Sequence, residues 1–275
     1  MDRKAQAALT WASMKVLITG SLGYIGTRVI PLINHQFDLL LTDLRAGEIA
    51  GKPVVPLDIT DYPALLEASK GVDAILHLAI ASYRDIVTDA ERFGKEEGEE
   101  YWRFRELSIE TNIRGTHHVL EAARRNGIAR VVYGSSLTVL IGRPFYEAVD
   151  DDLPPRPSNF YGVTKLWGEQ LAEFFSRQYG LRIYCLRFGT PYPQPDQPYF
   201  ERMLRDPVVW RTFVTYGDLA SAMTAALEAE GPLFGAYTVV SATSESIFDL
   251  SKGAEINWRP GDFIAQDGAV RSFPG

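Results

Sequence analysis

The side chains best suited to proton transfer are a tyrosine and a lysine four residues apart, Tyr161 and Lys165. Residues at this spacing lie on one face of a helix, so the ammonium of Lys165 can lie next to the phenol. A neighbouring positive charge lowers the pKa of a phenol and lets the phenolate act as a general base. The same spacing also occurs by chance on exposed helices, so the rest of the chain has to decide between the two interpretations.

A glycine-rich turn near the start of the chain could bind a dinucleotide. The β-branched run 15–19 predicts a strand, and the apolar spacing in 24–34 predicts a helix. Glycines between two such elements let the backbone approach a pyrophosphate, and the helix N-terminus offers free N–H groups to the anion. The residues of this predicted site are Gly20, Gly23, Tyr24, Ile25 and Gly26.

Aspartates follow the second and third predicted strands. Asp43 comes about twenty residues after the glycines, where a carboxylate can bind both ribose hydroxyls of adenosine and would repel a 2′-phosphate. This position favours NAD over NADP, although Arg45 could accommodate the additional phosphate of NADP. By their position after the third strand, Asp58 and Ile59 form a pocket for adenine.

Apolar strands alternate with helical segments over most of the chain. Such strands, with helices between them, predict a parallel sheet covered on both faces. We therefore expect a Rossmann-type, doubly wound α/β domain over residues 14–189, preceded by a disordered extension, 1–13. The proline-rich run after Gly189 breaks the pattern and predicts a small substrate-binding region, 190–275.

Composition excludes several classes of protein. The net charge of −7 disfavours nucleic acid and anionic lipid as partners, and no apolar run reaches membrane-spanning length. Cys185, the single cysteine, lies in an apolar run and reads as a core residue. The four histidines lack cysteine or carboxylate partners at ligand spacing, so we expect no metal. We find no secretory signal and expect a cytoplasmic protein.

The stretch 85–106 is dense in charged residues with interspersed aromatic residues. This composition predicts a solvated helical insertion whose aromatic side chains dock on the body of the protein. A lid over the active site is the second interpretation. A helix over 107–126 follows it.

In their order along the chain these motifs resemble the extended short-chain dehydrogenase/reductase family, which includes nucleotide-sugar epimerases, dehydratases and uronate dehydrogenases. The resemblance covers residues 14–189. It depends on the glycine turn, Asp43, Asp58, His77-Leu78-Ala79, Asn112-x-x-Gly115-Thr116, Ser135-Ser136 and the Tyr161/Lys165 pair. It implies NAD as cofactor, with Leu78 and Ala79 beside it, and a homodimer formed through the helices 107–126 and 161–179.

The resemblance also implies catalytic roles. Tyr161 would be the general base or acid, and Lys165 would bind the nicotinamide ribose and lower the pKa of the phenol. Ser136 would hydrogen-bond the reacting sugar oxygen, with Ser135 as its closest rival. Asn112 would support the lysine through backbone and water contacts.

The C-terminal region is most similar to that of uronate dehydrogenases, which oxidise a free sugar acid at its anomeric carbon to a lactone. The matching positions are Ser82, Thr190 and Arg202, the last of which corresponds to an arginine that binds the substrate carboxylate. A planar guanidinium suits that contact, but a surface arginine is an equally good interpretation. The chain has Leu137-Thr138 where those enzymes have Asn-His.

Together these features predict an NAD-dependent oxidoreductase that acts on a hydroxyl of a sugar or sugar acid, with Tyr161 as general base. An NAD-dependent nucleotide-sugar epimerase or dehydratase is the alternative, and a dinucleotide-binding protein without catalysis is a third. A dehydrogenase releases NADH, whereas an epimerase returns the hydride to its substrate.

Overall fold

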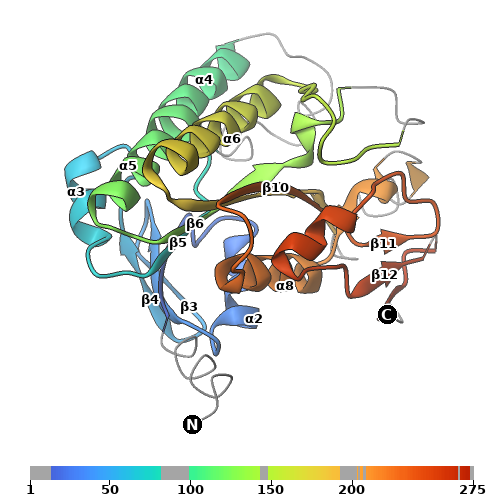
Figure 1. The fold of residues 1–275 in the computed structure, drawn as a ribbon, viewed down its shortest axis with the longest axis horizontal. Coiled ribbons are helices and arrows are strands. Elements are labelled where there is room, and N and C mark those ends of the chain that lie inside the picture. The colour runs from blue at the N-terminus through green and yellow to red at the C-terminus, as the bar shows by residue number, and fades with distance from the viewer. Residues whose placement is uncertain are drawn as a thin grey trace.

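A large, mostly parallel sheet forms the centre of the computed structural model, which describes residues 14–81, 99–142, 148–192, 203, 205–206, 209–265 and 267–272. Its eight strands follow the order β10-β7-β6-β5-β1-β2-β4-β3 (Figure 1). Only β3 runs antiparallel to its neighbour. The strands are β1 (Lys15–Thr19), β2 (Asp38–Asp43), β3 (Gly47–Ile49), β4 (Lys52–Pro56), β5 (Ala74–His77), β6 (Arg130–Ser136), β7 (Arg182–Phe188) and β10 (Phe234–Val239).

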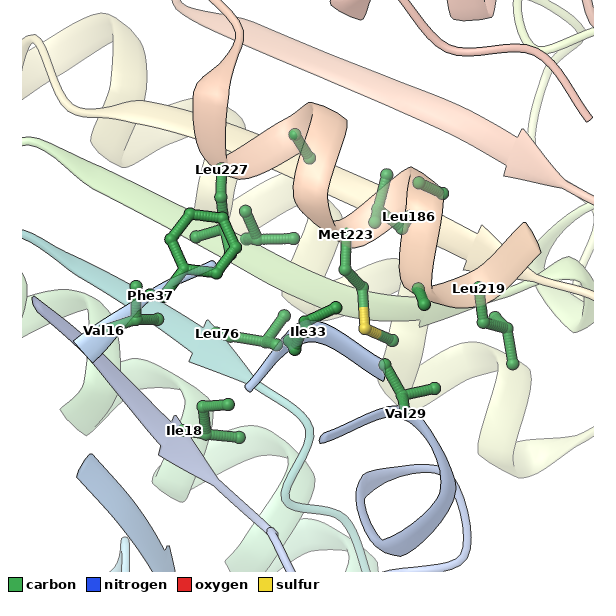
Figure 2. Packing of buried hydrophobic residues seen from close by; sticks show 14 of the residues in the cluster. Val16, Ile18, Val29, Ile33, Phe37, Leu76, Leu186, Leu219, Met223 and Leu227 are labelled. Atoms are coloured by element: carbon green, nitrogen blue, oxygen red, sulfur yellow. The ribbon is translucent and has the colours of Figure 1, made fainter. Parts of the chain in front are cut away.

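Helices cover both faces of this sheet. On one face α2 (Gly26–Ile33) and α8 (Tyr216–Glu228) pack on side chains such as Ile18, Leu76 and Leu186 (Figure 2). On the other face α3 (Tyr62–Ala68), α5 (Thr116–Arg125) and α6 (Phe160–Tyr179) pack on side chains such as Leu17 and Ile75. Leu17 and Ile18, which are neighbours in β1, are therefore buried on opposite faces of the sheet, because successive side chains of a strand alternate. The predicted doubly wound α/β fold is confirmed.

The helical stretch before α5 begins earlier than the sequence predicted. The segments α4 (Glu99–Ser108), η2 (Ile109–Gly115) and α5 follow one another without a break, so the predicted start at residue 107 is wrong. The charged stretch contributes an apolar face: Tyr101 and Phe104 are buried, while Trp102 is 59% exposed. Two of its aromatic residues therefore dock on the body as expected. The rest of the proposed insertion, up to residue 98, lies outside the described residues.

The part of the chain after Gly189 shares the large sheet. It contributes the edge strand β10 and the covering helix α8, and it also forms small sheets of its own. The division into domains at this residue stays a prediction, since α8 and β10 pack directly on the nucleotide-binding half. The remaining elements are η3 (Leu137–Val139), β8 (Thr190–Pro191), η4 (Trp210–Thr212), β9 (Phe213–Val214), β11 (Ala242–Thr243), η5 (Ser251–Ile256), β12 (Asp262–Ile264) and β13 (Val270–Ser272).

Two further expectations concern the single cysteine and membrane-spanning helices. Cys185 is fully buried within β7, as predicted. Within the described ranges, no helix combines the length and the apolar character needed to cross a membrane.

Candidate active site

Most of the predicted site residues that the structure describes follow the carboxyl ends of the parallel strands. The chain leaves β1 toward α2 on one face of the sheet, and the neighbouring β5 is followed by elements that lie on the other face. In open α/β sheets a crevice forms at such a switch point, and ligands bind there. The glycine-rich turn follows β1 at this place.

The glycine turn is packed too closely for any larger residue. Gly20 has a φ of +75°, and a Cβ there would lie 2.5 Å from the backbone N of Ala79. A Cβ at Gly26 would lie 2.3 Å from the carbonyl oxygen of Ser21. The predicted neighbours Gly20 and Ala79 are therefore in direct contact. Leu78 lies beside them and donates its N–H to the carbonyl of Thr19.

This turn fits the pyrophosphate of a dinucleotide. Gly23 is exposed, and the first turn of α2 contains no acidic residue that would repel an anion. Ile25 is the N-cap of α2, so its neighbours lie at the positive end of the helix dipole. Tyr24 lies beneath the guanidinium of Arg28, which is 4.1 Å from the ring centroid.

The two aspartates are held in different ways. Asp43 ends β2, and one of its carboxylate oxygens accepts a hydrogen bond of 2.9 Å from the N–H of Leu22 in the glycine turn. This bond fixes the carboxylate beside the predicted adenosine site. Asp58 is exposed and accepts hydrogen bonds from the N–H and hydroxyl of Thr60, both at 2.8 Å. Ile59 is buried next to Gly115, where a Cβ would clash with its side chain.

Ser136 and Tyr161 meet at the end of β6. Ser136 lies close enough to the phenol of Tyr161 to lower its pKa. Asn159 begins α6 by accepting a hydrogen bond from the N–H of Gly162, which places Tyr161 in the first turn of the helix. The rival serine points elsewhere, because the hydroxyl of Ser135 donates to Glu169 at 2.6 Å. The geometry therefore favours Ser136 over Ser135 for contact with a substrate.

Lys165 is buried and donates a hydrogen bond of 2.7 Å to the carbonyl oxygen of Gly134. Its ammonium nitrogen lies 5.7 Å from the ring centroid of Tyr161 and 4.7 Å from that of Tyr133. Burial lowers the pKa of Lys165 to about 7, and the nearby carboxylate of Glu169 partly offsets this.

The pKa of Tyr161 moves in the direction opposite to our expectation. Burial raises it above its ordinary value, and the nearby hydroxyl of Ser136 offsets only part of that rise. Tyr161 packs against a small cluster that contains Tyr101 and Phe104, so α4 contributes to this desolvation. In the protein alone the phenol is therefore neutral at physiological pH, and ionisation requires additional positive charge near it.

Asn112 links three elements around the site. It lies in η2, a π-helical segment of a kind often found at functional sites. Its Oδ1 accepts from the N–H of Ala81 at 2.8 Å, and its Nδ2 donates to Thr164 at 3.1 Å. Thr164 in turn donates to the carbonyl of Tyr161. The side chain thus contacts the first turn of the helix that carries Lys165 through Thr164, and its support of Lys165 stays a prediction.

His77 is a core residue, as the sequence indicated. Its two ring nitrogens lie 2.8 Å from the hydroxyl of Thr19 and 3.0 Å from that of Thr116. Burial and then the charge of Lys165 lower the pKa of His77 to about 3, so the imidazole is neutral. Among the residues that the structure describes, no three His, Cys, Asp or Glu side chains are grouped closely enough to hold a metal ion.

Of the three positions that match uronate dehydrogenases, one can be placed. The hydroxyl of Thr190 lies 2.8 Å from that of Thr212, which donates to the carbonyl of Val209. Ser82 and Arg202 lie outside the described residues.

A buried ionic network beneath the site was missed from the sequence. Arg187 binds both carboxylate oxygens of Glu169, at 3.0 and 2.9 Å, and also contacts Asp151. Asp151 accepts hydrogen bonds from the N–H and hydroxyl of Thr238 in β10. The available signals were a charge inside the apolar β7 and a glutamate four residues after Lys165. The pairing itself joins residues that are distant in the chain.

The geometry agrees with a family comparison. Residues 16–239 match the model of the NAD dependent epimerase/dehydratase family. The chain belongs to this family.

The proteins similar to this chain include dehydrogenases. The chain is 30% identical to a uronate dehydrogenase of Pseudomonas putida over 258 residues, which cover 90% of this chain and 84% of the relative. It is 29% identical to an L-arabinose 1-dehydrogenase (NAD(P)+) of Haloferax volcanii, with coverage of 90% and 96%. The solved uronate dehydrogenase of Agrobacterium tumefaciens has a TM-score of 0.72 at 28% identity, with 92% and 86% covered, and a variant of it was solved with NAD.

Replacement of Gly20 by alanine tests the packing of the glycine turn. Gly20 and Gly127 both have positive φ, but a Cβ at Gly127 would meet no atom within 4 Å. We expect Gly127→Ala to lower the free energy of unfolding by about 1 kcal/mol because of the left-handed backbone. Gly20→Ala should lower it by a further ~1–3 kcal/mol because of the clash with Ala79. Urea unfolding measures both, and equal losses would contradict this close contact.

The buried ammonium of Lys165 predicts a pH dependence of stability. Above a pH of about 7 the folded protein releases this proton, whereas the unfolded chain keeps it up to the ordinary pKa of 10.5. The free energy of unfolding contributed by this group should therefore rise as the pH increases between these values. Urea unfolding of the wild type and of Lys165→Met at several pH values measures the difference. The exposed Lys70→Met is the control, and parallel profiles for wild type and Lys165→Met would refute the assignment.

Proposed function

We propose that this protein is an NAD-dependent dehydrogenase that oxidises a hydroxyl group of a sugar or sugar acid, in the manner of a uronate dehydrogenase. One observation carries the proposal. Ser136 at the end of β6 and Tyr161 in the first turn of α6, with the buried Lys165 one helical turn along, lie at the same sheet edge as the glycine turn. A proton acceptor and a dinucleotide site at one edge suit hydride transfer.

The chain's own residues would handle the proton. When bound, NAD supplies the acceptor for the hydride that leaves the substrate carbon as its C–O bond becomes a carbonyl. Tyr161 takes the proton of the same hydroxyl, and Ser136 orients that hydroxyl by hydrogen bonding. Lys165 provides a cation on the same helix face, which opposes the effect of burial on the phenol. At an anomeric carbon the product is a lactone.

Asp43 supports NAD as the preferred cofactor. Its carboxylate is fixed at the end of β2 by the hydrogen bond from Leu22. There it can bind the ribose hydroxyls and repel a 2′-phosphate. Arg45 is exposed two residues later and could accommodate that phosphate, so the preference for NAD over NADP stays a prediction.

The similar proteins support a free sugar or sugar acid as substrate. The similar proteins include dehydrogenases named for uronate and for L-arabinose. Arg202 is proposed to bind the carboxylate through its planar guanidinium. A nucleotide-sugar epimerase is the second candidate, since the matching family model includes epimerases.

A homodimer is proposed through the helices on one side of the molecule. Large apolar side chains that are 40–59% exposed occur on α4, η2 and α6. The two helices α4 and α6 lie next to each other (Figure 1). These side chains are Trp102, Leu107, Ile109, Val163, Phe174 and Tyr179. Burial against a second copy would remove them from water. The cytoplasmic location stays a prediction.

Tyr161→Phe tests the catalytic proposal. The wild type should release NADH with at least one sugar acid or free sugar in a panel, followed by its absorbance. Removal of the phenol hydroxyl should lower kcat by about 10²–10⁴-fold and leave the Kd of NAD unchanged, because general base catalysis contributes this much. Tyr179→Phe, an exposed tyrosine of the same helix, is the control. Sugar interconversion without NADH release would point to the epimerase, and binding of NAD without turnover would contradict both.

Arg202→Lys tests the substrate class. The variant keeps the charge and loses the bidentate fork, so KM for a hexuronate should rise about tenfold, as expected for loss of a charge-assisted hydrogen bond. KM for the corresponding neutral hexose should not change. Arg205→Lys, three residues along the chain, is the matched control. An equal effect on acid and neutral sugar would disprove a carboxylate contact.

A further inference from the structure

The hydroxyl of Ser136 receives two hydrogen bonds from one residue, Thr138. The backbone N–H of Thr138 donates to Ser136 Oγ at 3.3 Å, and its hydroxyl donates to the same atom at 2.9 Å. The first bond belongs to the capping of η3 by Ser136. The second is an additional contact, which a residue without a hydroxyl at position 138 would lack.

These two bonds determine what Ser136 can still do. A serine hydroxyl has one O–H donor and two acceptor lone pairs. Both lone pairs are occupied by Thr138, so the remaining capacity of Ser136 is to donate its own proton. Ser136 lies near Tyr161 and lowers the pKa of its phenol, which is the effect of a donor that stabilises the phenolate.

Thr138 is itself fixed to the helix that carries Tyr161. Its carbonyl accepts a hydrogen bond of 3.0 Å from the N–H of Ser158, just before α6. A Cβ at Gly162 would lie 2.7 Å from that carbonyl oxygen and 3.2 Å from the hydroxyl, so the first turn of α6 packs directly on Thr138. One residue therefore contacts both Ser136 and the base of the helix that holds the phenol.

We propose that Thr138 is a positioning residue of the dehydrogenation, which holds Ser136 as a hydrogen-bond donor whose single proton is directed to the oxygen atom of Tyr161 or to that of the substrate. The inference rests on the proposed function and adds a residue to it. If Ser136 could also accept a hydrogen bond, the phenol of Tyr161 could donate its proton to Ser136. Such a bond would not stabilise the phenolate when the phenol has to lose its proton. Thr138 prevents that by occupying the acceptor sites.

Two variants of Thr138 test the inference. Thr138→Val keeps the shape and removes the hydroxyl, whereas Thr138→Ser keeps the hydroxyl. Loss of one hydrogen bond changes a rate constant by about tenfold, so kcat of the valine variant should fall by about that factor. The acidic limb of its kcat–pH profile should move about one pH unit upward, since one unit corresponds to about a tenfold change. The serine variant should retain the wild-type profile, and the Kd of NAD should be unchanged in both.

Several outcomes would overturn the inference. A valine variant with wild-type kcat and pH profile shows that the hydroxyl has no role in positioning Ser136. Equal losses in the valine and serine variants, or a loss of NAD binding, show that Thr138 serves only local packing.

A second measurement separates this inference from the proposed function. If the wild type oxidises no sugar in the panel, the proposed function fails, but the effect of Thr138 on the contact between Ser136 and Tyr161 can still be measured. The 13Cζ signal of Tyr161, assigned by its disappearance in Tyr161→Phe, reports on the donor at the phenol oxygen. It should shift in Thr138→Val and stay in place in Thr138→Ser. An unchanged signal in the valine variant would overturn the inference without reference to activity.

Discussion

The burial of one lysine is the constraint on which the arrangement of the site depends. Transfer of an ammonium out of water is unfavourable unless it gains hydrogen bonds or nearby negative charge. Lys165 has the carbonyl oxygen of Gly134 as a partner and the carboxylate of Glu169 on the next helical turn. Glu169 is in turn bound by Arg187, which also contacts Asp151. The charged groups beneath the site thus hold one another in place, and α6 is fixed to β6 and β7 as a result.

The same burial shifts the pKa values of the two titratable groups of the site in opposite directions. Desolvation disfavours the charged form of each, so it raises the pKa of Tyr161 and lowers that of Lys165. A site prepared in this way holds a neutral phenol until a substrate and a cationic ring arrive. Ser136 already opposes the effect on the phenol, and Thr138 gives that serine its direction.

Elements distant in the chain contribute to this geometry. Asn112 in the π-helical segment η2 connects the loop after β5 with the first turn of α6. The buried aromatic residues of α4 cover Tyr161 from another side. Strand β10, from the C-terminal part, is bound to the ionic network through Thr238. A change in any of these elements would therefore act on the phenol through packing, without contact with a substrate.

Much of the fold was predictable because its signals are local. The apolar runs gave the strands and the order of layers, and the glycine spacing and the strand-end Asp43 gave the dinucleotide site, since these patterns depend on neighbours in the chain. Tertiary structure alone favoured Ser136 over Ser135, joined Arg187 to Glu169 and Asp151, and extended the helix before η2 back to Glu99. It also reversed the expected direction of the pKa of Tyr161. Each of these outcomes depends on which surfaces exclude water from one another, and that is a property of the folded chain as a whole.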